Sequence, residues 1–221
     1  MARHKPRLAR DYRRKEATRE PYDVVLIVCE GEKTEPNYLK GLQKAYQLSN
    51  ANITIVPGDG NDPVSIVKCA LDTYQKADGI FDRVFCVFDR DSHVNYQQAL
   101  DRISTSPLGR KGKLEAITSV PCFELWILLH FVYTTAPFAG SGGRSACEKV
   151  IEAVREYLPE YEKAMTDVFQ KLQPNVDIAV THAERLVEHN RDTDSENPAT
   201  KVHELVKYLR GLRDVNRNAA K

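Results

Sequence analysis

The first half of the chain contains four short apolar runs, at residues 24–29, 53–56, 84–88 and 114–120. Continuous apolar runs of this length predict strands that are buried on both faces of a sheet. The intervening segments place apolar side chains at helical spacing, at residues 34–46, 62–76 and 93–103. Strands that alternate with helices of this length predict an α/β fold with a mostly parallel sheet flanked by helices.

The pattern changes after residue 121. Residues 122–131 are apolar on nearly all sides, which predicts a buried helix. Further helical spacing follows at residues 145–158, 160–172, 176–189 and 200–212. We therefore expect a polar N-terminal arm at residues 1–20, an α/β domain at residues 21–133, and a helical C-terminal region at residues 134–221 that packs on it.

The charge of the chain is unevenly distributed. Its 221 residues carry a net charge of +1, but Lys and Arg greatly outnumber acids in the first twenty residues. Basic ends on a nearly neutral protein suit contact with phosphate backbones, and Arg13, Arg14 and Lys15 are the candidate residues. The alternative is ordinary solubility charge on a tail.

The five cysteines show no C-x-x-C spacing. An odd count without a disulfide framework predicts a reducing compartment and argues against a zinc ribbon. The basic N-terminus does not resemble a signal peptide, and the apolar run at residues 122–133 is too short to span a bilayer. These features predict a cytoplasmic protein without a membrane partner.

Two acids follow the third apolar run directly. Asp89 and Asp91 are two residues apart, so in an extended chain they lie on one face. Carboxylates held that close repel each other unless a cation lies between them, and a divalent metal ion is the usual solution. The alternative is a strand that ends in a solvated acidic turn.

Two further acids, Glu30 and Glu124, are candidates for the same site. Glu30 follows the first predicted strand, and parallel crossovers bring the carboxyl ends of successive strands to one edge of the sheet. Glu124 is the lone acid of the apolar run at residues 122–131, where a carboxylate is costly unless it is paired or bound to a metal. The alternative is a carboxylate that stabilises the N-terminus of its own helix.

Other polar residues have competing interpretations. Lys33 and Glu35 lie at a helix N-terminus, which is a ready anion site, although Glu35 also suits a first helical turn. His93 can contact phosphate, orient Asp91 or cap a helix. Buried His130 is expected to be a core residue. Asp62 is expected to cap a helix, as is Thr34.

The combination of Cys29-Glu30-Gly31 with Phe88-Asp89-Arg90-Asp91 resembles the Toprim domain of topoisomerases, primases and several nuclease families. The chain as a whole resembles the RloB-like family, bacterial Toprim proteins often encoded beside restriction or phage-defence genes. The stretches that match are residues 28–38, 87–93, 121–126, 130–131 and 197–203.

The resemblance implies a specific activity. In Toprim enzymes the Asp-x-Asp pair holds Mg²⁺ and the glutamate acts as general acid or base. Here Asp89 and Asp91 would hold Mg²⁺ (or Mn²⁺), Glu124 would complete the metal ligands, and Glu30 would handle the proton beside Lys33. The chain would then be a nuclease acting on DNA or RNA, in anti-phage or abortive-infection defence, with nucleic acid as its partner. A homodimer or a partner protein encoded nearby would also fit.

Two other functions are compatible with these residues. One is a non-catalytic Toprim module that binds nucleic acid or nucleotide within a defence complex. The other is a phosphoryl-transfer enzyme of the haloacid-dehalogenase kind, which also places Asp-x-Asp after a strand. That class usually has the pair on its first strand, where this chain has Glu30, and it ranks below the nuclease.

Overall fold

A five-stranded sheet forms the centre of the molecule. The computed structural model describes residues 23–49, 52–58, 60, 62–90 and 93–219, with side chains to residue 212. Its strands lie in the order β2-β1-β3-β4-β5. They are β1 (Val25–Cys29), β2 (Ile53–Pro57), β3 (Arg83–Asp89), β4 (Leu114–Val120) and β5 (Ala199–Thr200). The first four are parallel and β5 is antiparallel to β4, which confirms the predicted α/β class.

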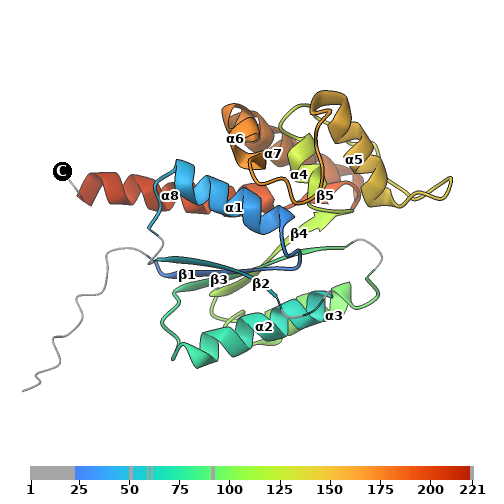
Figure 1. Ribbon diagram of the computed structural model, residues 1–221. Coiled ribbons are helices and arrows are strands. Elements are labelled where there is room, and N and C mark those ends of the chain that lie inside the picture. The colour runs from blue at the N-terminus through green and yellow to red at the C-terminus, as the bar shows by residue number, and fades with distance from the viewer. Residues whose placement is uncertain (1–22, 50–51, 59, 61, 91–92, 220–221) are drawn as a thin grey trace, which may run out of the picture.

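Helices cover both faces of the sheet. The connecting helices are α1 (Thr34–Ala45), α2 (Pro63–Lys76) and α3 (Tyr96–Thr105). Figure 1 shows α2 and α3 below the sheet and α1 above it. Because β1 is buried on both sides, Val25 and Ile27 join the core under α1, whereas Leu26 and Val28 join the core over α2. This two-sided burial explains why the strand is apolar without interruption.

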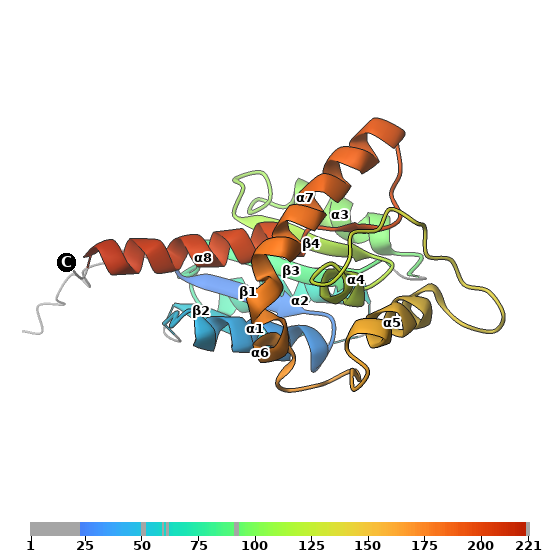
Figure 2. The same ribbon diagram turned by 90° about the horizontal axis from the view of Figure 1, so that it is seen from above.

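The C-terminal half covers the α1 face. Its elements are α4 (Glu124–Leu128), α5 (Ala146–Tyr157), α6 (Val168–Leu172), the 3₁₀ turn η1 (Gln173–Asn175), α7 (Val176–Thr193) and α8 (Val202–Ala219). In Figure 2, seen from above, α7 and α8 lie over the same face as α1. Trp126 and Phe169 belong to the same continuous core as the upper residues of β1. The helical region is therefore packed on the sheet, and it also contributes β5.

Several element boundaries differ from the prediction. The helix expected at residues 160–172 begins only at Val168, because Ala164 has a positive φ of 73° that a helix does not permit. The helix expected from Thr200 begins at Val202, because Thr200 lies in β5 and its hydroxyl accepts from Val202 N–H. The helix expected at residue 93 begins at Tyr96.

The capping predictions had mixed outcomes. Asp62 caps α2, accepting from the backbone N–H groups of Val64 and Ser65, as expected. Thr34 is not the cap of α1: it is the first helical residue, and its hydroxyl accepts from Ala164 N–H instead. A contact 130 residues away along the chain thus takes the place of the local one.

The direction in which the chain adds strands to the sheet reverses between β1 and β3. Helix α1 follows β1 and enters the upper core, whereas α3 follows β3 and enters the lower core. The segments that follow these two neighbouring strands therefore run toward opposite faces of the sheet. Such a switch point opens a crevice at the carboxyl edge, where sheets of this kind bind their ligands. Within the part of the chain that the structure describes, no helix has the length and apolar character needed to cross a bilayer.

Candidate active site

Glu30 and Asp89 meet at the switch point of the sheet. Glu30 follows β1 and Asp89 ends β3, the strand beside it. Glu30 N–H donates to Val87 O (2.9 Å), which extends the strand pairing by one residue. Glu30 Oε2 in turn accepts from the backbone N–H of Asp89 (2.9 Å). The prediction that these two acids share one edge is confirmed by their contact.

His93 is the second partner of Glu30. Its Nε2 lies 2.8 Å from Glu30 Oε1, so both carboxylate oxygens of Glu30 have a partner. The Glu30 side chain is only 13% exposed. Burial raises its pKa, while the Asp89 N–H and His93 act against that rise. His93 was expected to contact phosphate or Asp91; the structure places it on the carboxylate predicted to handle a proton.

Glu124 approaches the same site from the C-terminal half. It is the first residue of α4, and the side chain is buried. Its Oε1 accepts from the Tyr161 hydroxyl (3.2 Å) and lies 3.7 Å from Lys163 Nζ. Oε2 lies 3.4 Å from Cys147 Sγ. The buried carboxylate predicted for this segment is therefore partnered by residues that are distant in sequence.

Glu35 also lies inside the site. It lies in the first turn of α1, as one of its two interpretations predicted, and it is only 5% exposed. Burial, followed by repulsion from Glu124 and Glu30, raises its pKa to about 7. The Glu35 carboxyl lies over the turn at Gly31, where a Cβ atom would overlap Glu35 Oε2. A glycine at position 31 is what lets this carboxyl enter the site.

Asp89 is the most strongly perturbed of these acids. Removal from solvent, followed by repulsion from Glu35, Glu124 and Glu30, raises its pKa well above the usual value of a carboxyl group. A hydrogen bond from the Phe123 backbone acts in the opposite direction. Four carboxyl groups from β1, α1, β3 and α4 thus repel one another in one place, which favours a cation among them.

A cavity of about 390 Å³ joins these groups. All four acids line it, together with His93, Lys33 and Lys163. Sequence reasoning identified the acids, His93 and Lys33 but missed Lys163 and Tyr161. No local signal marks either residue, because both lie in the irregular segment between α5 and α6, whose place beside Glu124 depends on the packing of the C-terminal half.

Four predicted site residues lie outside the described part of the chain. These are Asp91 and the three basic residues of the arm, Arg13, Arg14 and Lys15. The metal ligand pair expected from Asp89 and Asp91 is therefore represented here by Asp89 alone.

The donor atoms fit a hard cation held by oxygen ligands. Carboxylates are the groups with which proteins bind Mg²⁺ and Mn²⁺, and this cavity brings together Glu30, Glu35, Asp89 and Glu124. Among the described residues, however, no three of these acids bring ligand atoms within 4.8 Å of one another. The trio that does, Cys122, Glu124 and Cys147, includes two sulfur atoms joined in a disulfide and is not a cation site. A metal ion among the acids would therefore draw on water or on further groups for the rest of its ligands.

The cysteine prediction needs a correction. The five cysteines were expected to form no disulfide framework, but Cys122 is bonded to Cys147 with a Cα–Cα separation of 5.6 Å. The two residues are 25 positions apart and meet because α5 packs on α4. Spacing along the chain carried no signal of this pairing. Cys29, Cys69 and Cys86 are free.

His130 is a core residue, as expected. Its Nδ1 lies 2.9 Å from Trp126 O, and Nε2 lies 3.4 Å from the Tyr38 hydroxyl. Burial lowers its pKa to about 4, so the ring is neutral at physiological pH. It supports the aromatic core behind the site and does not reach the acids.

A comparison with models of protein families identifies the family of the chain. The model of the family described as RloB-like protein matches residues 25–209. The chain belongs to the RloB-like protein family. That match covers each of the four acids that line the cavity, as well as His93 and Lys163. Searches of the curated proteins and of the solved structures found nothing that matches this RloB-like chain.

Proposed function

We propose that this RloB-like protein is a divalent-metal-dependent nuclease that hydrolyses phosphodiester bonds in DNA or RNA. The observation that carries the proposal is the convergence of Glu30, Glu35, Asp89 and Glu124 on one cavity at the switch point of the sheet. A surface that merely binds polyanions gains nothing from buried carboxylates, whereas a metal-assisted hydrolase needs them. The Toprim resemblance of the residues around Glu30 and Asp89 points the same way.

In this proposal Asp89 and Glu124 hold Mg²⁺ or Mn²⁺, with Asp91 as a further ligand. When bound, the ion polarises the scissile phosphate and stabilises the charge that develops on its oxygens. The Phe123 N–H, which hydrogen-bonds to Asp89, keeps that carboxylate oriented. The Tyr161 hydroxyl does the same for Glu124. Fixing the ligands in advance spares reorganisation during the reaction.

Glu30 and His93 form the proton-handling pair. Burial raises the pKa of Glu30, which brings a carboxyl group closer to the range in which it exchanges protons near neutral pH. His93 Nε2, 2.8 Å from Glu30 Oε1, passes a proton to or from this carboxylate or holds it in place. Lys33 and Lys163 line the same cavity and supply positive charge near a bound phosphate.

The biological setting is part of the proposal. We place the nuclease in anti-phage or abortive-infection defence, on the strength of the family resemblance. Nucleic acid is its proposed substrate, with the basic arm that includes Arg13, Arg14 and Lys15 as a further contact. A second copy of the chain or a partner protein encoded nearby would complete such a system.

A cleavage assay tests the activity. The wild-type protein is incubated with single- and double-stranded DNA and RNA in Mg²⁺, Mn²⁺ or EDTA, beside Asp89→Asn and Glu124→Gln. Glu156→Gln, an exposed acid in α5, is the matched control. We expect metal-dependent cleavage by the wild type and the control, and a loss of at least about a hundredfold in both site variants.

Two outcomes would refute the nuclease. One is a wild-type protein that cleaves none of these substrates with either metal. The other is Asp89→Asn cleaving as fast as the wild type. If the inactive wild type still binds nucleic acid or nucleotide, the function becomes that of a non-catalytic binding module.

A further inference from the structure

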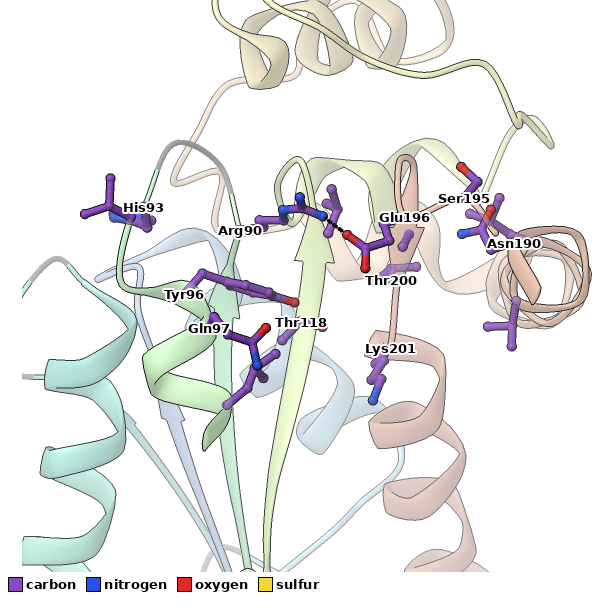
Figure 3. A pocket seen from close by; sticks show the side chains of 16 residues that line it. Arg90, His93, Tyr96, Gln97, Thr118, Asn190, Ser195, Glu196, Thr200 and Lys201 are labelled. Atoms are coloured by element: carbon purple, nitrogen blue, oxygen red, sulfur yellow. Dashed lines mark hydrogen bonds and ion pairs between the residues drawn. The ribbon is translucent and has the colours of Figure 1, made fainter. Parts of the chain in front are cut away.

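A second cavity opens beside the candidate active site. It measures about 510 Å³, within the range of small-molecule sites in proteins. It lies where the two halves of the chain meet, between α3, the ends of β3 and β4, β5 and the last turns of α7 (Figure 3). Neither the four acids nor Lys33 and Lys163 line it, so it is distinct from the acidic cavity.

The walls of this cavity combine an apolar surface with an aromatic ring. Leu100, Val120 and Leu186 contribute aliphatic side chains to the lining. Tyr96 belongs to the same lining, and Figure 3 shows its ring. The Tyr96 ring is fixed from behind by an edge contact with Phe88 of β3 (5.8 Å between centroids). A rigid aromatic wall next to aliphatic groups suits a flat, weakly polar ring system.

The rim of the cavity is positively charged. Arg90 and Lys201 line it, and its acid, Glu196, forms an ion pair with Arg90 (2.6 Å). Figure 3 shows this pair between the end of β3 and the segment before β5. The Arg90 side chain is 41% exposed and that of Glu196 is 77% exposed, so a phosphate group can compete with Glu196 for the guanidinium. Lys201 is exposed as well.

One polar wall atom has no partner in the described part of the chain. Asn190 Nδ2 donates to Pro198 O (2.7 Å), which fixes the orientation of the amide. Its Oδ1 is shielded from solvent and accepts no hydrogen bond. Asn190 lines the cavity, so an amino group on a ligand against this wall would supply the missing donor.

His93 connects this cavity with the active site. It lines both cavities, and its Nε2 contacts Glu30. Arg90 directly follows Asp89 in the chain. A ligand in the second cavity therefore lies next to the position proposed for the scissile phosphate.

We propose that this cavity binds one nucleoside monophosphate unit. The base lies against Tyr96 and the aliphatic wall, Asn190 Oδ1 accepts from a base amino group, and Arg90 faces the phosphate. Lys201 lies at the other end of the cavity from Arg90, where it donates to the base (Figure 3). The proposal deepens the nuclease function and rests on it for the neighbouring scissile bond. The unit is either a nucleotide of the substrate strand or a free nucleotide, since both present the same chemistry.

Calorimetric titration of the intact protein tests this site. The probes are the nucleoside 5′-monophosphates, ribose 5-phosphate, which lacks a base, and five-nucleotide single strands. We expect the nucleotides to bind at least about fivefold more tightly than ribose 5-phosphate, because base stacking contributes to affinity. Lys201→Ala should weaken nucleotide binding about tenfold, whereas Lys207→Ala, in α8 and outside the cavity, should not.

Two further variants address the base. Tyr96→Leu should weaken nucleotide binding at least about fivefold while ribose 5-phosphate is unaffected. Because Tyr96 also packs on Phe88, Val187→Trp is the alternative: this residue is 45% exposed and lines the cavity, so the larger ring fills it without entering the core. The proposal is overturned if ribose 5-phosphate binds as well as the nucleotides, or if Lys201→Ala and Val187→Trp bind them like the wild type.

The remaining outcomes separate the site from the nuclease. A five-nucleotide strand that binds more tightly than a mononucleotide, and is weakened equally by Lys201→Ala, identifies a substrate nucleotide. Equal affinity for both identifies a free nucleotide. If all cavity variants cleave with unchanged KM and the wild type binds no mononucleotide, the cavity site is overturned and the nuclease proposal stands. Mononucleotide binding that Lys201→Ala weakens, with no cleavage of any substrate, supports the cavity site and overturns the nuclease.

Discussion

The imidazole Nε2 of His93 lies 2.8 Å from Oε1 of Glu30, and this contact links the loop after β3 to the end of β1. The other oxygen of Glu30 accepts from the Asp89 backbone. Glu30 is therefore held from both sides by the neighbouring strand and its loop. Its orientation and its proton affinity depend on the position of β3.

This contact predicts a shift in the pH dependence of cleavage. His93 acts to lower the pKa of Glu30, against the larger effect of burial. His93→Ala removes the imidazole that counteracts the effect of burial on this pKa, so the pKa of Glu30 rises. If Glu30 is the general base, the acid limb of the pH profile of kcat/KM moves to higher pH in His93→Ala. An acid limb that moves to lower pH, or stays in place, would contradict this role.

Glu30→Gln should be the more damaging change. Loss of a positioned general acid or base typically lowers rates by about 10² to 10⁴. We expect a fall of this size in kcat for Glu30→Gln, with little change in KM, and no acid limb from this residue. The control is Glu156→Gln, which should keep the wild-type rate and profile. Cleavage by Glu30→Gln at more than a tenth of the wild-type rate would assign the proton transfer to another group.

Thermal unfolding should reveal the cation site independently of activity. A ligand present at one hundred times its Kd stabilises the folded state by about 2.7 kcal/mol, which corresponds to a Tm increase of about 5–10 °C for a protein of this size. We expect Mg²⁺ or Mn²⁺ to raise the Tm of the wild type and of Glu156→Gln. Asp89→Asn should respond little to either ion. Equal increases in all three proteins would place metal binding elsewhere.

Glu35 predicts a pH dependence of stability. Its pKa is raised from 4.5 to about 7 in the folded state, chiefly by burial, so the folded protein holds this proton more tightly than the unfolded chain. The contribution of Glu35 to stability is therefore lost as pH rises from about 4.5 through 7, by about 3 kcal/mol in total. Glu35→Gln mimics the protonated carboxyl and should remove this loss.

Chemical denaturation at pH 5 and pH 8 without divalent ions measures this effect. Glu35→Gln should match the wild type at pH 5 and exceed it at pH 8. Glu160→Gln is the control, because Glu160 is an exposed acid outside the cavity. A difference between Glu35→Gln and the wild type that does not grow with pH would contradict the raised pKa.

Gly31 predicts a steric coupling to Glu35. A Cβ atom at position 31 would overlap Glu35 Oε2, so Gly31→Ala must displace the buried carboxyl. We expect a loss of about 1–3 kcal/mol in unfolding free energy, as for other overpacked sites. Combining it with Glu35→Ala, which removes the clashing group, should abolish most of that loss.

Gly211 provides the matched control for this substitution. It lies in α8, and a Cβ atom there meets nothing within 4 Å. Gly211→Ala should therefore stabilise the protein slightly, by up to about 1 kcal/mol, because alanine is the better helix former. An equal loss from both glycine substitutions, or a loss at Gly31 that persists without Glu35, would refute the steric coupling.

The apolar runs carried most of the information about the sheet. All four predicted strands are present, because a strand buried on both faces must be apolar along its whole length, and that pattern is local. The edge location of Glu30 and Asp89 followed from the same pattern, since parallel crossovers place strand ends together. Burial of residues 122–130 was likewise evident from their composition.

The errors occurred where a distant contact overrode a local preference. The Thr34 hydroxyl accepts from the Ala164 N–H, Ala164 interrupts a predicted helix, and residues 199–200 pair with β4. Cys122 meets Cys147 across α4 and α5. Each depends on how the C-terminal half folds back on the sheet, which spacing along the chain does not encode.

By itself, then, the sequence determined the α/β class, the strands and the edge that carries the acids. Only the tertiary structure decided that Glu35 is buried among them, that His93 contacts Glu30, and that Lys163 and Tyr161 approach Glu124. The physical reason is that the two kinds of information depend on different distances along the chain and in space. Periodicity reports which side of an element is buried, whereas electrostatic repulsion and hydrogen bonding depend on distances between atoms that only the packed chain brings together.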